Sequence, residues 1–95
     1  MSQSFFKFRL YVAGDSPNSQ LALANLHAFC RELVPESHEI DVVDVLQEPR
    51  RALADNILLT PVLVKLAPAP VRRIVGNLSR REVLLTTLGF NGAAT

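Results

Sequence analysis

Apolar and polar residues alternate near the beginning of the chain, over residues 5–13. One side of this alternation is formed by Phe6, Phe8, Leu10 and Val12. A period of two residues is typical of a strand that buries one of its faces. The pattern therefore predicts an N-terminal strand that packs these side chains against a core.

Three further apolar segments predict strands over residues 40–46, 62–66 and 71–75. The first of them carries apolar residues on both sides, with Ile40 and Val42 sharing one side. Strands that are covered on both faces usually lie in the middle of a layered sheet. We therefore expect residues 40–46 to form a central strand.

Apolar residues at helical spacing predict a helix over residues 17–34, and a shorter helix is predicted over residues 50–56, after Pro49. Ser16 is the predicted N-cap of the first helix, where its oxygen would accept a backbone N–H, and Pro17 suits the first helical position. The buried face of the long helix is predicted to contain Leu23, Leu26, Phe29, Cys30, Leu33 and Val34.

The last predicted helix covers residues 79–88. Ser79 and Glu82 have the spacing of a capping box, in which the serine bonds forward and the glutamate bonds back. Gly89 is the predicted C-terminal cap, because glycine adopts the left-handed conformation that ends many helices. These local signals favour a helix at this position.

The predicted order is strand, helix, strand, helix, strand, strand, helix. With a right-handed crossover between the first two strands, it gives an α/β fold with a four-stranded mixed sheet and three helices on its two faces. This order resembles the thioredoxin-like arrangement, βαβαββα. A length of 95 residues suits a single domain, which we expect to span residues 1–95.

Composition narrows the classes of function. A net charge of +1 is too balanced for a nucleic-acid binder that neutralises phosphates. No apolar segment approaches the roughly 20 residues that a membrane span needs. The single cysteine, Cys30, allows neither an internal disulfide nor a four-cysteine metal site. With no signal peptide at the start of the sequence, we expect a cytoplasmic protein that binds neither nucleic acid nor membranes.

The corner between the first strand and the first helix carries Ser16-Pro17-Asn18-Ser19. In thiol proteins of the thioredoxin type this corner holds two cysteines, and a cis-proline precedes a neighbouring strand, as Pro61 does here. We therefore expect Ser16 and Ser19 to lie close to a cis Pro61, in a redox architecture without its sulfurs. A redox enzyme or glutathione binder is the least favoured alternative.

A serine nucleophile at this corner would need a base, and the chain offers His27 and His38. The first is more than two helical turns from Ser16, and the second begins a predicted strand. Two separated histidines are also a poor metal site. We expect no catalytic residue, no metal and no cofactor.

Several segments taken together resemble the KaiB family of cyanobacterial clock proteins, and the resemblance extends over about residues 8–88. The segments are Leu-Tyr-Val-Ala-Gly at 10–14, Ser-Pro-Asn-Ser at 16–19, Thr-Pro-Val-Leu-Val-Lys at 60–65, Pro-Val-Arg-Arg-Ile-Val-Gly at 70–76 and Leu-Ser-Arg-Arg-Glu at 78–82.

This resemblance implies a non-enzymatic adaptor. Such proteins bind the N-terminal ATPase ring of the clock kinase KaiC. The assembly then sequesters the activator KaiA and displaces a thioredoxin-like sensor domain of a histidine kinase. The family is also metamorphic, with a thioredoxin-like monomer that binds KaiC and a tetrameric ground-state fold in which the C-terminal half is rearranged.

The rearranged fold resembles one whose chain ends in a strand, and residues 88–93 are poor in strand formers. The predicted caps at Ser79 and Gly89 favour a helix instead. Two such folds differ by only a few kcal/mol, so local terms of this kind decide their populations. We predict that the thioredoxin-like monomer prevails, with residues 71–76 forming a strand.

The resemblance also suggests sites. Lys65, Arg72 and Arg73 match basic positions of the family and are expected to contact acidic groups on the ATPase, although they could instead be solvated charges that protect an edge strand. The strand from Ile40 to Val45, with Ile40 and Val42 as candidate contacts, is a candidate for strand addition by a second protein. The alternative function is a stand-alone sensor domain akin to that of the clock histidine kinase.

Overall fold

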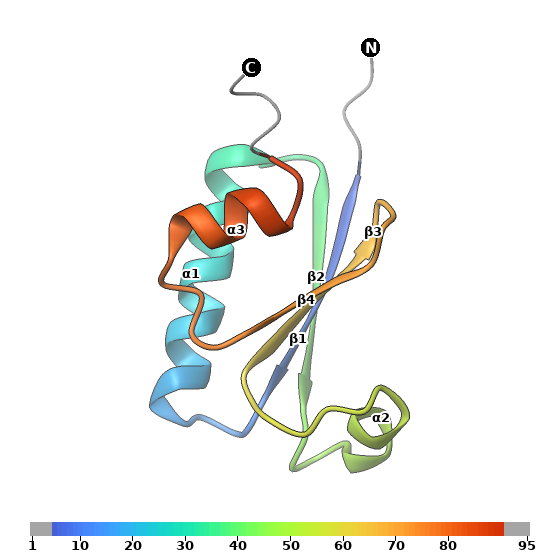
Figure 1. The fold of residues 1–95 in the computed structure, drawn as a ribbon. Coiled ribbons are helices and arrows are strands. Elements are labelled where there is room, and N and C mark those ends of the chain that lie inside the picture. The colour runs from blue at the N-terminus through green and yellow to red at the C-terminus, as the bar shows by residue number, and fades with distance from the viewer. Residues whose placement is uncertain (1–4, 91–95) are drawn as a thin grey trace.

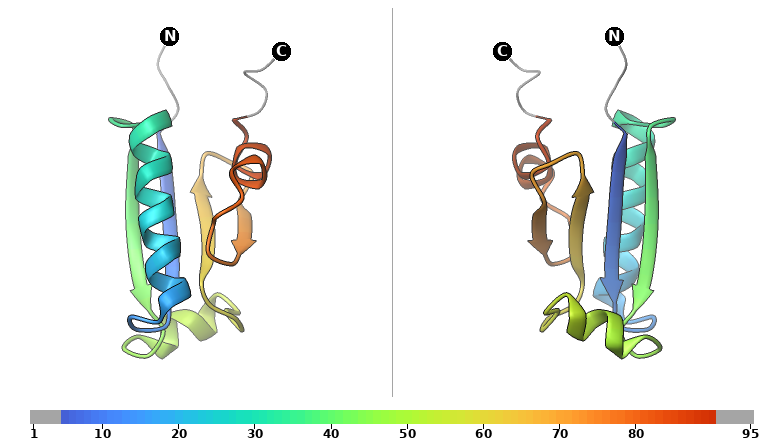
Figure 2. Two further views of the ribbon diagram at one scale, coloured as in Figure 1. Left: turned by 90° about the vertical axis from the view of Figure 1, so that its left-hand side faces the viewer. Right: turned by 90° about the vertical axis from the view of Figure 1, so that its right-hand side faces the viewer.

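The computed structural model describes residues 5–90 and contains one mixed sheet of four strands in the order β2-β1-β3-β4. The strands are β1 (Phe6–Val12), β2 (His38–Asp44), β3 (Val62–Ala67) and β4 (Arg72–Val75). β1 runs parallel to β2 and antiparallel to β3, and β4 runs antiparallel to β3. Figure 2 shows β2 and β4 at the two margins of the sheet. The predicted mixed sheet is confirmed.

Within residues 5–90 three helices flank the sheet: α1 (Pro17–Leu33), α2 (Pro49–Ala54) and α3 (Arg81–Thr87). α1 and α3 pack on one face, where they share a hydrophobic cluster with β1 (Figure 1). The short α2 contributes to a smaller cluster on the opposite face. None of the helices within residues 5–90 combines the length and the apolar character that a membrane span requires.

The larger cluster contains the alternating side chains of β1, as predicted. Phe6, Phe8, Leu10 and Val12 are all buried there. Phe90 extends this cluster beyond α3, because its ring stacks on Phe6 at a centroid distance of 4.8 Å. Most of the predicted buried face of α1 is also present, with Leu26, Phe29, Cys30 and Val34 buried and Leu23 and Leu33 partly buried.

The prediction that residues 40–46 form a central strand is wrong. β2 begins earlier, at His38, and pairs with β1 alone within residues 5–90, so β1 and β3 occupy the centre. Its apolar residues do point to both faces: Ile40 packs against the larger cluster and Val43 belongs to the smaller one. Both helical layers therefore reach over this edge strand, which gives it the composition of a central one.

α1 begins where the sequence predicts, but the Ser16 side chain forms a different hydrogen bond from the predicted one. Ser16 is the N-cap and Pro17 the first helical residue, as predicted. The Ser16 side chain caps no backbone N–H. Its hydroxyl donates instead to Oγ of Ser19 at 2.9 Å.

The predicted capping box at α3 is wrong. The helix begins at Arg81 with Arg80 as N-cap, and no side chain caps its start. The Ser79 N–H donates to Oδ1 of Asn77 at 3.1 Å, so a local turn competes with the helix for this segment. The Glu82 carboxylate accepts a bond from Arg80 at 3.2 Å. Its pKa is lowered first by a bond with its own backbone N–H and then by Arg80.

The end of α3 is formed as predicted. Gly89 follows the helix with φ +91, a conformation that favours glycine. Its N–H donates to the carbonyl of Thr86 at 3.4 Å, and that of Phe90 donates to Leu85 at 2.7 Å. This pair of bonds is the Schellman motif, which satisfies two carbonyls at a helix end.

Candidate functional site

Ser16 and Ser19 form a hydrogen-bonded corner between β1 and α1. Ser19 is 2% exposed, and its Oγ accepts the N–H of Ala13 at 3.1 Å as well as the Ser16 hydroxyl. The β1–β3 register pairs Tyr11 with Val62, so Pro61 lies at the same end of the sheet as this corner. The Thr60–Pro61 peptide is cis, as expected. The sequence had not indicated that Ser19 would be buried.

Neither histidine is a hydrogen-bond partner of these serines within residues 5–90. Nδ1 of His38 lies 2.6 Å from the Val34 carbonyl oxygen, and His27 is exposed on α1. The serine hydroxyls pair with each other and with the backbone, so the corner is arranged to hold the β1–α1 turn. Nothing in this arrangement prepares a serine for nucleophilic attack.

The cysteine thiol lies on the buried face of α1. Cys30 is 0% exposed, and burial raises its pKa to about 11. A thiol with this pKa stays protonated near neutral pH and is a weak nucleophile. Cys30 therefore acts as a small core residue, in agreement with the sequence-based interpretation.

The three predicted basic contacts divide between the two faces of the sheet. Lys65 on β3 is directly opposite Arg72 on β4. Both point to the face of α1 and α3, because Leu63 and Ile74, two residues away on each strand, are part of the larger cluster. Arg73 points to the opposite face, where its Nη2 donates to the backbone carbonyl of Asp55 at 2.7 Å.

Lys65 does not lie on an exposed edge, as one sequence-based alternative supposed. It is in an interior strand and is 4% exposed. Within residues 5–90 its ammonium has no hydrogen-bond partner. No side-chain nitrogen in this range is both fully buried and without a partner, so Nζ of Lys65 must reach the surface. Burial first, and then the charge of Arg72, lowers the pKa of Lys65. The two cations face no described carboxylate, so a carboxylate from outside would stabilise both.

The two apolar candidates on β2 differ in accessibility. Ile40 is half-buried against the larger cluster, whereas Val42 is 40% exposed at the edge of the sheet. The structure thus makes Val42, but little of Ile40, available to a neighbouring strand.

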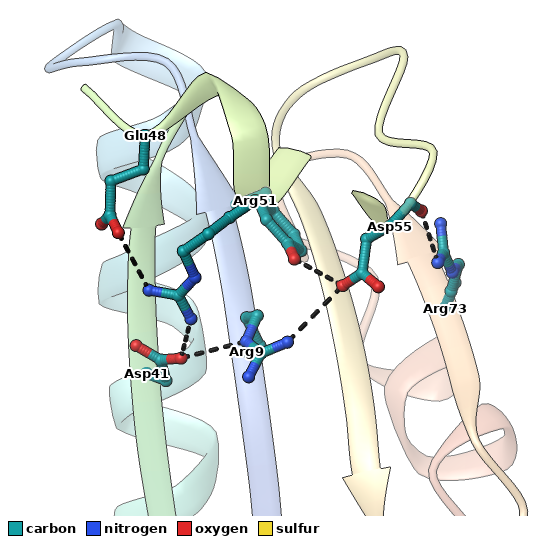
Figure 3. Close-up of polar contacts among 7 residues, drawn as sticks. Arg9, Asp41, Glu48, Arg51, Asp55 and Arg73 are labelled. Carbon is teal, nitrogen blue, oxygen red and sulfur yellow. Dashed lines mark hydrogen bonds and ion pairs between the residues drawn. The ribbon is translucent and has the colours of Figure 1, made fainter. Parts of the chain in front are cut away.

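A network of ion pairs that the sequence analysis missed covers the opposite face of the sheet (Figure 3). Oδ2 of Asp41 accepts bonds from Nε of Arg9 at 3.0 Å and from Nη2 of Arg51 at 2.6 Å. Arg9 also lies 3.5 Å from Asp55, which accepts the Tyr11 hydroxyl. The network therefore connects α2 and the residue that follows it to strands β1 and β2.

The electrostatics of this network favour an ionised Asp41. Burial would raise its pKa, but the bonds from Arg51 and Arg9 outweigh burial and lower it. Arg9 and Asp41 are directly paired in the β1–β2 register. That register was the one signal from which the pair could have been found, and hydrophobic periodicity does not supply it.

Comparisons with known proteins agree with this description. The family model of the KaiB domain matches residues 9–90. The circadian clock protein KaiB3 of Synechocystis sp. is 38% identical over 88 residues, which cover 93% of this chain and 86% of the relative.

Two solved structures are similar in fold. The solution structure of the N-terminal domain of Synechococcus elongatus SasA has a TM-score of 0.69 at 19% identity, covering 98% of this chain and 83% of that domain. Oxidized mitochondrial thioredoxin 3 from Saccharomyces cerevisiae has a TM-score of 0.69 at 14% identity, covering 88% of this chain and 76% of the thioredoxin. These similarities confirm the predicted thioredoxin-like fold.

Proposed function

The chain belongs to the KaiB family of circadian clock proteins, and from this premise we propose that it is a non-enzymatic adaptor that binds a KaiC-type ATPase. Its partner surface would be the N-terminal ATPase ring. The bound adaptor would then help to sequester KaiA and so control phosphorylation of the ATPase.

One observation supports this proposal above the others: Lys65 and Arg72 stand side by side without a described carboxylate. Four other cations within residues 5–90, Arg9, Arg51, Arg80 and Arg81, do pair with carboxylates, and Arg81 holds Glu32 on α1 at 2.8 and 2.7 Å. The exposed Arg72 on the edge strand, next to a second unpaired cation, favours an acidic partner, because complementary charge orients the encounter and accelerates it. Arg73, which points to the opposite face of the sheet, would contact a second acidic group of the partner.

A second contact is proposed at the edge of β2, where Val42 is 40% exposed. A strand of a second protein, such as KaiA, would pair with this edge. Ile40 would support it from the core side.

A pull-down with a KaiC-type ATPase, with and without ATP, tests the adaptor. We expect ATP-dependent capture, and we expect Arg72→Glu to reduce the captured amount about tenfold, because it replaces attraction to an acidic partner with repulsion. Arg31→Glu is the matched control, since Arg31 is an exposed cation in the last turn of α1.

Equal capture by the two variants would contradict the assigned contact. If the native chain captures no ATPase, the adaptor function is contradicted. The stand-alone sensor domain would then be the better interpretation.

A further inference from the structure

β4 has one open side. Among residues 5–90 it pairs with β3 alone. The Gly76 N–H donates to the Pro61 carbonyl at 2.9 Å, toward β3. In an antiparallel pair the backbone groups of successive residues point alternately to the two sides. The N–H and C=O groups of Arg73 and Val75 therefore point away from β3, ready to bind another strand.

Two hollows flank this open side, one on each face of the sheet. The first has a volume of about 240 Å³ and lies between β4 and the start of α3. The second has a volume of about 160 Å³ and lies between β4 and the segment before β3. The first is lined by Ile74, Gly76, Leu78 and Val83, and the second by Ile57, Leu58, Leu59 and Val75.

The second hollow exposes a large apolar surface. Leu58 is 87% exposed, Leu59 64% and Val75 60%. An added strand directs successive side chains to opposite faces of the sheet. Two adjacent apolar residues of such a strand would therefore enter one hollow each.

Charge favours the same edge for an acidic segment. Arg72 is exposed, and it faces Lys65 on the same side as the first hollow. The other open edge, β2, carries the exposed Glu39, and its Asp41 is already paired with Arg9 and Arg51. An acidic strand would be attracted to Arg72 at β4 and repelled by Glu39 at β2.

We propose that the β4 edge accepts an extended, acidic segment of a partner protein as a fifth strand. In an antiparallel register, two adjacent apolar residues opposite Val75 and Ile74 occupy the two hollows. A carboxylate two positions after the second of them lies opposite Arg72, beside Lys65. This inference rests on the proposed function and deepens it, because it states the form in which the acidic partner meets Arg72.

The test uses a short blocked peptide with two adjacent valines followed by threonine and glutamate, labelled with fluorescein and titrated into the full chain. We expect saturable binding, amide NMR shifts centred on Arg73 and Val75, and slower hydrogen exchange of these two amides. A peptide with lysine in place of the glutamate should bind at least tenfold more weakly.

Two variants separate strand addition from contact through side chains. Val75→Pro removes an N–H that points away from β3, and Val75→Thr alters the side chain but keeps the N–H. We expect the proline variant to bind more than tenfold more weakly than the threonine variant. If Val75→Pro does not fold, the exchange rates of the Arg73 and Val75 amides in the native chain decide the question.

Several results would overturn the inference: no saturation with the peptide, equal binding by the two Val75 variants, unchanged exchange at both amides, or shifts confined to β2. Capture of the ATPase that is insensitive to Val75→Pro would overturn it while leaving the proposed function intact. Peptide binding without capture of the ATPase would support the acidic strand at β4 and contradict the proposed partner.

Discussion

At the scale of single residues, Lys65 shows why a charged side chain is hard to place from sequence. It sits opposite Phe8 on one side and Arg72 on the other, in a strand whose other members are apolar. Its stem is covered while Nζ reaches the surface, as long cationic side chains allow. Desolvation of the ammonium works against folding, and the neighbouring guanidinium adds repulsion.

Replacing Lys65 with methionine should therefore raise the free energy of unfolding, by roughly 0.5–1 kcal/mol at neutral pH, because the stem is kept and the charge removed. The folded-state pKa of Lys65 is lowered from 10.5, so the unfolded chain binds more protons and native stability rises as pH approaches that value. The advantage of Lys65→Met should shrink between pH 7 and pH 10 in urea titrations.

The exposed Lys7 provides the control for this measurement, since Lys7→Met should change stability little. A lower stability of Lys65→Met at pH 7 would show instead that the ammonium makes a favourable native contact.

At the scale of elements, α2 has few apolar contacts and is held largely by charge. Ala52 is its one buried residue, whereas Arg51 reaches Asp41 on β2 and Glu48 at 3.2 Å. Coupled ion pairs of partly exposed side chains contribute more than isolated ones, although solvent limits the gain.

Asp41→Asn should weaken this attachment and lower the free energy of unfolding by about 0.5–1 kcal/mol at pH 7. The folded-state pKa of Asp41 is lowered below 3.8, so its contribution is present above that pH and is lost as pH falls through the folded-state pKa. The difference between the variant and the native chain should therefore narrow in thermal unfolding as pH falls below 3.8.

Glu39→Gln supplies a matched comparison, because Glu39 is an exposed acid in the same strand. A difference between Asp41→Asn and the native chain that persists unchanged at pH 3 would rule out the carboxylate charge as its cause.

The helices and strands themselves were largely predictable from the sequence, but which strands lie next to each other was not. Hydrophobic patterning located the four strands and α1, because burial of one face is a local property of the sequence. Pro49 and the Gly89 cap located α2 and α3. Strand order depends on which distant segments pair, so the edge position of β2 and the Arg9–Asp41 pair were missed. The start of α3 was misplaced because Asn77 offered a competing bond to the Ser79 N–H. The sequence placed Lys65, Arg72 and Arg73 on the correct strands. It did not indicate that Lys65 would be buried in an interior strand.

At the scale of the whole molecule, the structure has the thioredoxin-like arrangement, with Arg72–Val75 as a strand. That this arrangement prevails in solution, over the rearranged fold that the resemblance implies, stays a prediction. The Schellman motif at Gly89 supports it, because a left-handed residue there ends α3 and lets Phe90 return to the core.

Gly89→Ala should destabilise this end by about 1 kcal/mol, since a Cβ is unfavourable at positive φ. We expect NMR chemical shifts of the native chain to show residues 72–75 as a strand, and the variant to populate the thioredoxin-like state less. Thr86→Ala, at an exposed position of α3, should leave the populations unchanged or favour the helix. Helical shifts at residues 71–76 in the native chain would contradict the prediction.

The unpaired margin of β4 also bears on how the protein behaves in crowded solution. Uncovered strand margins are where identical chains stack into aggregates. If two copies paired there with Arg73 of one opposite Arg73 of the other, these cross-strand like charges would repel. The positive charge of β4 thus disfavours self-association at this edge, and concentrated salt weakens this protection because it screens the charge.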